Sequence, residues 1–428
     1  MKYIIWGAGN RGKWTLKFLG EENVNAFIDS NKEKIGKSIY GKMIISPEQA
    51  IKESDNSFIV ITPLNGSNEI ERWLKNNNFT CYLKLDDCPM SIPCDEQEEF
   101  SFRLQYKNNI CYGLLGVNLF SLWLCDELKK HNIPVKVSCQ EGLSKDVLTL
   151  LKREYQIVQK SVLISTSEKI IVMEGFDYPT SDTHYIAVDD FIIQSMSDIR
   201  SELLRYKNIH VGKRCFIVAT GPSLTVEDLK TLHEHREICF SMNRIFNIFS
   251  KTEWRPDYYV VGDKEMIEDL SDEIAYLDLN NKFISTIPHS YWKNPKSKGS
   301  MPYKILMRGF NDRKPLFSTR AEYGLYQGTT VTYLCIQLAV YMGFSEIYLL
   351  GVDFSYTNNL YDPQNHFAGC DNTGRKVRLN PICPERTLLA YESSAEYCKN
   401  HYIKIFNATR GGKLEVFERK CFDSLFLK

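Results

Sequence analysis

A short apolar strand that leads directly into a glycine turn and then a helix occurs twice in this chain. The first unit has a strand over residues 3–6, a turn with three glycines, and a helix over residues 13–19. The second has a strand over residues 215–219, the turn TGPS at residues 220–223, and a helix that begins at Val226. Strands that alternate with helices are typical of parallel sheets whose connections cross over as helices. The sequence therefore predicts an α/β fold.

The length and the restart of this pattern predict more than one domain. The chain has 428 residues, which is too many for one hydrophobic core. We expect a Rossmann-like nucleotide-binding domain with a parallel sheet over residues 1–90. A doubly wound Rossmann-like domain is expected over residues 201–428. Residues 91–200 are interpreted as a second α/β segment or a continuation of the first sheet.

The middle segment repeats the strand and helix pattern only weakly. Its glycine turn is reduced to Gly113 and Gly116, and residues 176–198 are interpreted as a linker or a covering segment. The apolar runs predict strands at residues 110–113, 135–137, 162–165 and 170–173 and a helix at residues 118–131.

Charge, cysteine content and hydropathy limit the classes of partner and compartment. Lys plus Arg and Asp plus Glu both number 53, so no net charge favours nucleic acid or an acidic membrane. The thirteen cysteines are scattered without a C-x-x-C pair, which suits a reducing compartment better than a disulfide framework. The N-terminus has no apolar stretch long enough for a signal peptide or a membrane span. These features predict a soluble cytoplasmic protein with no transmembrane segment and no nucleic-acid partner.

The first glycine turn has the spacing of a dinucleotide-binding fingerprint. Gly7, Gly9 and Gly12 follow the first strand, and Asp29 ends the next one. In such a motif the first glycine forms the turn, the second lets the backbone approach a pyrophosphate, and the third lets helix and strand pack closely. The acid bonds a ribose hydroxyl. We predict that these four residues bind a nucleotide; a domain that keeps the turn for its fold alone would have the same pattern.

The second turn is a candidate phosphate site. Gly221 permits a tight turn, Pro222 suits the first position of the following helix, and Ser223 supplies a hydroxyl beside free N–H groups. The positive end of the helix dipole would favour a phosphate there. A plain helix N-cap would have a similar sequence.

Other strands of the C-terminal half also end on small polar residues, where a doubly wound sheet binds its ligands. A long apolar helix begins after Gly328, and His366 follows in a polar loop. The polar strand ends are Asn243, Asp263, Asp353 and Asn407.

The order of these motifs resembles a known family. The segments FIVATGPSL, SMNRIF, GTTVTYLCIQLAVYMGFSEIYLLGVDFSY and NHF match, in this order, motifs of small bacterial sialyltransferases that use CMP-sialic acid. The tail IFNATRGGKLEVF is similar to the broader group of motility-accessory flagellin glycosylation proteins and 6-hydroxymethylpterin diphosphokinases. The stretch that contains AFIDSN and FIVIT resembles the nucleotide-binding domains attached to bacterial sugar-modifying enzymes.

The resemblance implies a role for each motif. His366 would be the general base, Asp353 would bind the nucleotide or shape the site, and Tyr356 and Tyr361 would assist the departing phosphate. Thr329 and Thr330 would contact the sugar carboxylate or phosphate. The residues expected to bind the nucleotide are Thr220, Gly221, Pro222, Ser223, Asn243, Thr329, Thr330 and Gly351. The chain departs from the family pattern in the short spacing from Asp353 to His366 and in Thr220, where those enzymes carry Asn.

The predicted function is a sialyltransferase-like glycosyltransferase that acts in surface glycan or glycoprotein synthesis. Its substrates would be a nucleotide-sugar donor, in particular a CMP-sugar, and a glycan or protein acceptor. Peripheral association with a glycan-assembly complex is compatible with this role. No tightly bound cofactor and no metal site are expected. One alternative is an ATP-dependent pyrophosphoryl transferase of the pterin diphosphokinase kind, which would need Mg²⁺ with ATP, and a second is a non-catalytic sugar-nucleotide-binding protein.

Overall fold

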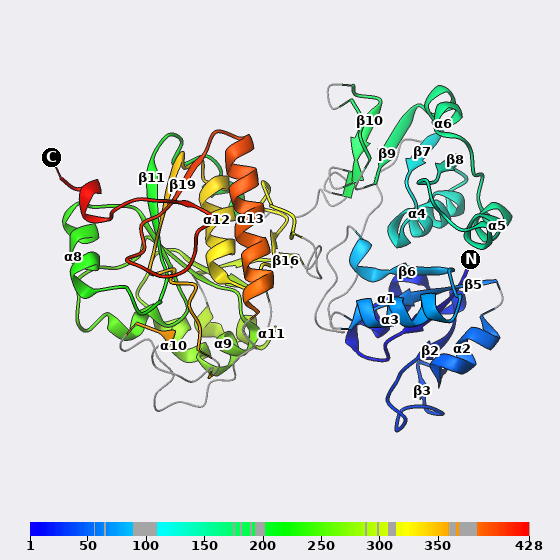
Figure 1. The fold of residues 1–428 in the computed structure, drawn as a ribbon, viewed down its shortest axis with the longest axis horizontal. Coiled ribbons are helices and arrows are strands. Elements are labelled where there is room, and N and C mark those ends of the chain that lie inside the picture. Colours follow the sequence, from blue (N-terminus) through cyan, green and yellow to red (C-terminus); the bar gives the residue numbers. More distant parts are fainter. Residues whose placement is uncertain are drawn as a thin grey trace. The chain divides into compact units, whose positions relative to one another are not determined.

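The computed structural model divides into two compact units, Met1–Asp198 and Ile199–Lys428 (Figure 1). No helix among the residues that the structure describes is long and apolar enough to cross a bilayer. The described residues are 1–54, 56–63, 66–88, 109–173, 176–179, 182–188, 191–192, 202–286, 289–297, 299–306, 314–357, 359, 365–367 and 383–427.

The first sheet of the N-terminal unit has the Rossmann strand order. Its order is β3-β4-β2-β1-β5-β6, and all neighbours are parallel except the edge pair of β3 and β4. Without that edge strand, the order corresponds to 3-2-1-4-5, which is the doubly wound arrangement for nucleotide binding. The strands are β1 (Lys2–Trp6), β2 (Val24–Ile28), β3 (Ser38–Ile39), β4 (Lys42–Ile45), β5 (Ser57–Ile61) and β6 (Tyr82–Lys84), and the helices are α1 (Asn10–Leu19), α2 (Pro47–Glu53) and α3 (Ser67–Asn76).

A second sheet in the same unit has the order β10-β9-β7-β8 and is separate from the first. The two sheets share one apolar core, in which Phe18 of the first layer stacks on Trp123 of the second with ring centroids 5.1 Å apart. The strands are β7 (Tyr112–Leu115), β8 (Val135–Ser138), β9 (Lys169–Val172) and β10 (Tyr185–Ala187), and the helices are α4 (Leu119–Lys130), α5 (Lys145–Glu154) and α6 (Lys160–Thr166).

Several sequence predictions for this middle segment are wrong. The strand expected at residues 162–165 lies within helix α6, because a short run of apolar residues has no periodicity that separates a strand from a helix. The first strand lies two residues later than expected, so Gly113 is part of β7 and only Gly116 lies in the turn, with φ +105°. The segment interpreted as a linker or a covering segment contributes the edge strand β10, which a linker alone would not.

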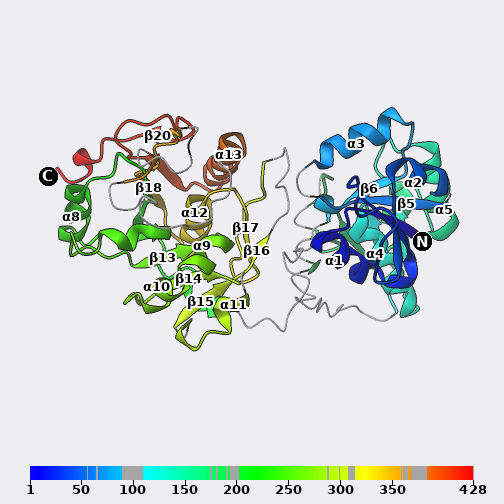
Figure 2. The same cartoon turned by 90° about the horizontal axis from the view of Figure 1, so that it is seen from below.

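The C-terminal unit is built on one sheet of eight parallel strands, which confirms the predicted doubly wound fold. Its order is β15-β14-β13-β12-β11-β18-β19-β20, and Figure 2 shows the succession from β15 and β14 to β18 and β20. The strands are β11 (Arg214–Val218), β12 (Cys239–Met242), β13 (Tyr258–Val261), β14 (Lys282–Ser285), β15 (Ser300–Tyr303), β18 (Glu346–Leu350), β19 (Lys404–Asn407) and β20 (Glu418–Arg419).

Helices cover both faces of this sheet, and a separate apolar cluster lies under each set. On one face pack α12 (Val331–Tyr341) and α13 (Pro384–Asn400), and on the other α8 (Val226–Glu234), α9 (Lys264–Asp269) and α10 (Ser271–Tyr276). Shorter elements are α11 (His289–Trp292), the strand pair β16 (Ile305–Leu306) and β17 (Leu325–Tyr326), and the 3-10 helices η1 (Glu21–Asn23), η2 (Leu85–Asp87), η3 (Glu202–Tyr206), η4 (Asn243–Ile248), η5 (Pro295–Ser297) and η7 (Asp423–Leu425).

The strand order reverses between β11 and β18. The chain leaves β11 through α8 toward β12 on one side, whereas β18 lies on the other side of β11. The loops that follow these two strands therefore diverge and leave a crevice at their carboxyl ends, where open α/β sheets bind ligands.

Candidate functional site

The loops after β11 and β18 approach each other so closely that only glycine fits at position 221. A Cβ atom there would lie 2.1 Å from Asp353 Oδ2 and 2.4 Å from the carbonyl oxygen of Gly351. The backbone N–H of Gly221 donates to that same carbonyl at 2.9 Å. The glycine predicted to permit a tight turn is thus required for contact between the two loops.

Ser223 bonds to Asp353 across this contact. Its hydroxyl donates to Asp353 Oδ2 at 2.8 Å, and its backbone N–H lies 3.4 Å from the same oxygen. Burial raises the pKa of Asp353 above its ordinary value, although the hydrogen bonds from Ser223 favour the ionised form. We expected the Ser223 hydroxyl to bind a phosphate. In the structure it bonds to the carboxylate of Asp353 and orients it.

The helix after this turn begins at the predicted residue but does not include Pro222. Helix α8 begins at Val226 with Thr225 as its N-cap, so the assignment of Pro222 to the first helical position is wrong. The reason is a capping box, in which the side chains of Thr225 and Asp228 each bond the backbone N–H of the other at 3.1 Å. Glu227 and Asp228 also place negative charge in the first turn, so the positive end of this helix dipole is already balanced.

Helix α12 begins in the same region and has no acidic residue in its first turn. Thr330 is its N-cap and accepts the N–H of Thr332 at 3.3 Å. The hydroxyl of Thr332 lies 3.7 Å from the sulfur of Met242 at the end of β12, which brings the first turn of α12 to the carboxyl edge of the sheet. The N–H of Tyr333 donates to the carbonyl oxygen of Thr330 at 3.2 Å, so the cap residue accepts two of the first N–H groups of this helix. Without an acid in its first turn, the positive end of the α12 dipole is not balanced by a negative side chain on the helix.

Asn243 begins η4 directly after β12 and has an unsatisfied side chain. Its φ is +52°, and its Oδ1 atom is buried without a hydrogen-bond partner among the described residues. A buried amide oxygen without a donor is costly, and a ligand N–H or O–H would relieve that cost. The next residue, Arg244, is also buried, and it borders the same cavity. Sequence reasoning missed Arg244, because a buried Arg in an apolar run gives no local signal.

His366 is held beside the β11 loop by its two neighbours. The N–H of Phe367 donates to the carbonyl oxygen of Thr220 at 2.7 Å. Asn365 is buried and accepts the N–H of Thr357 at 2.9 Å, while its own amide donates to the hydroxyl of Thr357 at 3.1 Å. The sequence motif therefore contains two residues that position the histidine.

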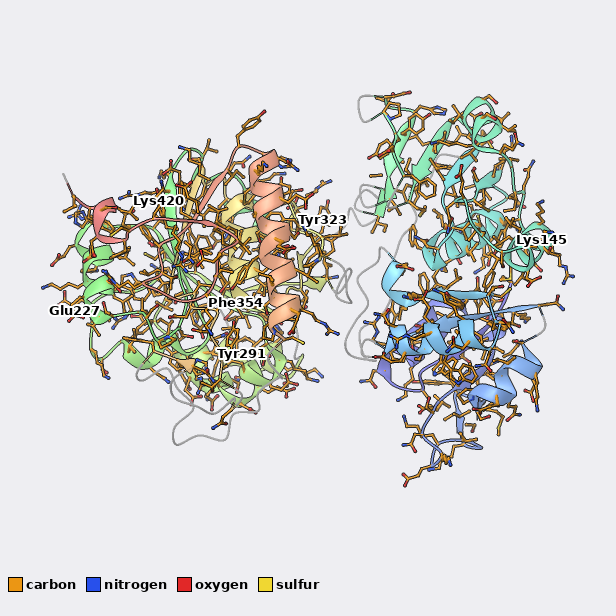
Figure 3. The ribbon with its side chains drawn as sticks, in the orientation of Figure 1. Lys145, Glu227, Tyr291, Tyr323, Phe354 and Lys420 are labelled. Carbon is orange, nitrogen blue, oxygen red and sulfur yellow. The ribbon has the colours of Figure 1, made fainter. Side chains whose placement is uncertain are left out.

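Tyr356 lies on the same loop, and its ring packs edge-on against Phe354 with centroids 5.8 Å apart. Loss of water around its hydroxyl raises the pKa of Tyr356 well above the ordinary value, although 41% of the residue is exposed, and the charges of Tyr391 and Asp353 add to the shift. Tyr356 thus remains a hydrogen-bond donor at neutral pH. Phe354, labelled in Figure 3, also contacts Tyr391 of α13. Tyr361 lies outside the described residues.

These elements border one cavity of about 280 Å³, near the lower end of the range of roughly 300–1,000 Å³ for small-molecule sites. Three non-glycine residues on its wall, Asn243, Thr329 and Phe354, have φ between +51° and +59°. Such strained backbone is concentrated at functional sites. Ser223 is not on the wall. The residues predicted from sequence that border the cavity are Thr220, Gly221, Pro222, Asn243, Thr329, Thr330, Gly351, Asp353, Tyr356 and His366.

The glycine turn of the N-terminal unit has the fingerprint geometry. A Cβ on Gly12 would lie 1.8 Å from the carbonyl oxygen of Gly7, whereas one on Gly9 would meet nothing within 4 Å. Asp29 already accepts hydrogen bonds from Lys34 at 2.8 Å and from the N–H of Asn31 at 2.9 Å. Partial burial opposes ionisation, but these bonds lower the pKa of Asp29 below its ordinary value. A ribose would have to share this carboxylate with Lys34.

Residues 191–359 match a family model described as 6-hydroxymethylpterin diphosphokinase MptE-like. This part of the chain is similar to MptE-like proteins. The match confirms the predicted resemblance to the pterin diphosphokinase group, and it includes β11, α12 and β18 of the candidate site. Residues 1–81 match a second model, described as C2185-like, N-terminal.

Comparison with curated proteins gives no match. Among solved structures, the chain is similar to the MAf glycosyltransferase from Magnetospirillum magneticum AMB-1, with 18% sequence identity and a TM-score of 0.35. The alignment covers 74% of this chain and 58% of that protein.

Proposed function

We propose that this protein is a glycosyltransferase that takes a nucleotide-activated sugar, and that the donor is a CMP-sugar as in the sialyltransferases that its motifs resemble. The supporting observation is that His366 and the N-terminus of α12 border one cavity at the strand-order reversal. Transfer from such a donor needs a base for the acceptor hydroxyl and donors for the departing phosphate. A cavity with both features suits glycosyl transfer better than the alternative of a non-catalytic sugar-nucleotide-binding protein.

Each step of the transfer has a candidate group. The imidazole of His366 would take the proton of the acceptor hydroxyl, a role in which a histidine is effective near neutral pH. The phosphate would bind at the first N–H groups and hydroxyls of α12. Tyr356, whose pKa is raised, would donate its phenolic hydrogen bond to a phosphate oxygen as the bond to the sugar breaks. Asn243 Oδ1 would accept from the base or the ribose.

The acceptor and the biological setting follow from the same proposal. The acceptor would be a glycan or a protein in surface glycan or glycoprotein synthesis, and association with an assembly complex would be peripheral. No tightly bound cofactor is needed for this chemistry, because the donor brings its own leaving group.

The family match favours one alternative, an ATP-dependent pyrophosphoryl transfer. That reaction would need Mg²⁺, and Asp353 and Asp263 both border the cavity. Asp263 Oδ1, however, accepts the N–H of Met266 at 2.8 Å as the cap of α9. Among the described residues no three His, Cys, Asp or Glu side chains come together as a metal site.

A binding screen separates these functions. Isothermal titration calorimetry of the full chain would compare CMP, a CMP-sugar and ATP, each with and without Mg²⁺. The proposed transferase binds CMP and the CMP-sugar without Mg²⁺, whereas the diphosphokinase binds ATP only with it. A chain that binds no cytidine nucleotide would rule out the CMP-sugar proposal.

A further inference from the structure

We propose that Asp353 recognises the ribose hydroxyls of the bound nucleotide, so that this site discriminates ribonucleotides from 2′-deoxyribonucleotides. The inference rests on the proposed function in one respect, namely that the cavity binds a nucleotide. It goes further by assigning the ribose of that nucleotide to one carboxylate and its phosphate to the N-terminus of α12.

The first argument is that the Asp353 carboxylate has few donors. Its exposed fraction is 8%, and it borders the cavity. Among the described residues its side chain accepts from Ser223, and no basic side chain pairs with it. An ionised carboxylate has room for about four hydrogen bonds, and a buried one that lacks them is unfavourable. A ligand with hydroxyl groups would supply the missing donors.

The second argument is the sign of the charge. Asp353 would repel a phosphate or a sugar carboxylate, but it attracts neutral hydroxyls. The end of α12 has the opposite preference, because its first turn carries no acid and the helix dipole places positive charge there. Within one cavity these two ends orient a nucleotide with its phosphate at α12 and its ribose at Asp353. Vicinal hydroxyls match a carboxylate because each can donate one hydrogen bond.

The third argument is that a separate loop holds the backbone of Asp353 in place. The N–H of Lys413 donates to the Asp353 carbonyl at 2.7 Å, and the N–H of Val352 donates to the hydroxyl of Thr409 at 3.0 Å. A Cβ on Gly412 would lie 2.6 Å from the same carbonyl oxygen, so the contact is tight.

This loop, residues 408–414, is itself fixed by Arg419. The Arg419 guanidinium donates to the carbonyl oxygen of Gly411 at 2.7 Å and to that of Gly412 at 3.3 Å. Asn407 accepts the N–H of Thr409 at 3.0 Å and donates to the carbonyl of Leu414 at 2.9 Å. Residues 407–419 of the tail motif therefore hold the backbone of Asp353 in place, and we call this loop the brace. A carboxylate with a fixed backbone can bind hydroxyls at fixed positions.

The test is the ratio of the dissociation constants of 2′-deoxy-CMP and CMP for the full chain. We expect the wild type to bind CMP about tenfold to a hundredfold more tightly, the range for hydrogen bonds to a charged group. Asp353→Asn should bring the ratio close to one, and Thr409→Val should lower it partly because the brace is loosened. Asp146→Asn on the exposed surface of α5 is the matched control and should leave the ratio unchanged.

The wild-type comparison needs no variant, so a poorly folded Asp353→Asn protein does not remove the test. Equal binding of CMP and 2′-deoxy-CMP by the wild type would overturn the ribose assignment while leaving the proposed function intact. An unchanged ratio in folded Asp353→Asn would also overturn it. If the chain binds ATP and not CMP, the ratio of the dissociation constants of 2′-deoxy-ATP and ATP tests the ribose assignment in the same way. A chain that binds no nucleotide would contradict both the function and the inference.

Discussion

The backbone N–H of Phe367 donates to the carbonyl oxygen of Thr220 at 2.7 Å, and this bond joins the histidine loop to the turn after β11. The two residues are far apart in the sequence, and neither side chain takes part. Through this bond a histidine in an irregular segment reaches the edge of the parallel sheet. The relationship explains why His366 and the TGPS turn belong to one site.

If His366 is the general base, its replacement by Ala should remove turnover and spare binding. We expect the rate of CMP release from a CMP-sugar to fall by about 10²–10⁴. The dissociation constant of CMP, measured by calorimetry, should change little because the nucleotide contacts remain. His233→Ala, on the exposed side of α8, serves as the control. Unchanged turnover in His366→Ala would remove this residue from the mechanism.

Asn365 should act as a positioning residue for His366. Asn365→Ala removes the bonds to Thr357 and the one to the carbonyl of Asn359 at 2.9 Å. The lost hydrogen bonds stabilise the loop around His366 by about 1–3 kcal/mol. Without them we expect turnover to fall tenfold or more, with a smaller effect on CMP binding. Asn365→Asp keeps the acceptor for the Thr357 N–H, so it should lie between wild type and Asn365→Ala. Equal turnover in all three proteins would argue against this role.

The glycines of the N-terminal turn should differ in their tolerance of alanine. Gly12→Ala would place a Cβ 1.8 Å from the Gly7 carbonyl and should destabilise the unit by about 1–3 kcal/mol. Gly9→Ala meets open space and changes only an N-cap, so it should cost about 1 kcal/mol or less. Thermal unfolding of the two variants provides the comparison. Equal losses would show that close packing is not the reason for Gly12.

His210 should make the stability of the C-terminal unit depend on pH. Its Nε2 lies 2.6 Å from the hydroxyl of Tyr258, and its Nδ1 is buried without a partner among the described residues. Burial lowers the pKa of His210, and the charge of Lys213 lowers it further. The folded state therefore prefers neutral imidazole, while the unfolded state takes up a proton below about pH 6.5.

The stabilisation from neutral His210 is present above that pH and is lost as the pH falls through it. His210→Phe, which keeps a ring beside Phe344, should lose less unfolding free energy than the wild type between pH 7 and 5. Urea denaturation at several pH values measures this difference. Parallel pH profiles would mean that His210 does not contribute.

The sequence predicted the elements that have strong local signals. The prediction of a strand at residues 346–350 agrees with β18, and the polar strand ends marked the edge of the sheet. The sequence-based prediction was wrong where a local pattern is ambiguous: the strand expected at residues 162–165 is part of the helix at residues 160–166. The sequence also gave no sign of the brace on Asp353 or of buried Arg244, because both depend on residues that meet only after folding.

By itself, the sequence determined the α/β fold, the parallel sheets and the sheet edge that carries the candidate site, since these follow from periodicity and from residues at strand ends. Only the tertiary structure decided that the Ser223 hydroxyl bonds to Asp353. It also decided that α12, which has no acid in its first turn, borders the cavity with its N-terminus. The reason is competition among nearby donors and acceptors. A motif specifies which groups are available, but their packed positions decide which of them remain for a ligand.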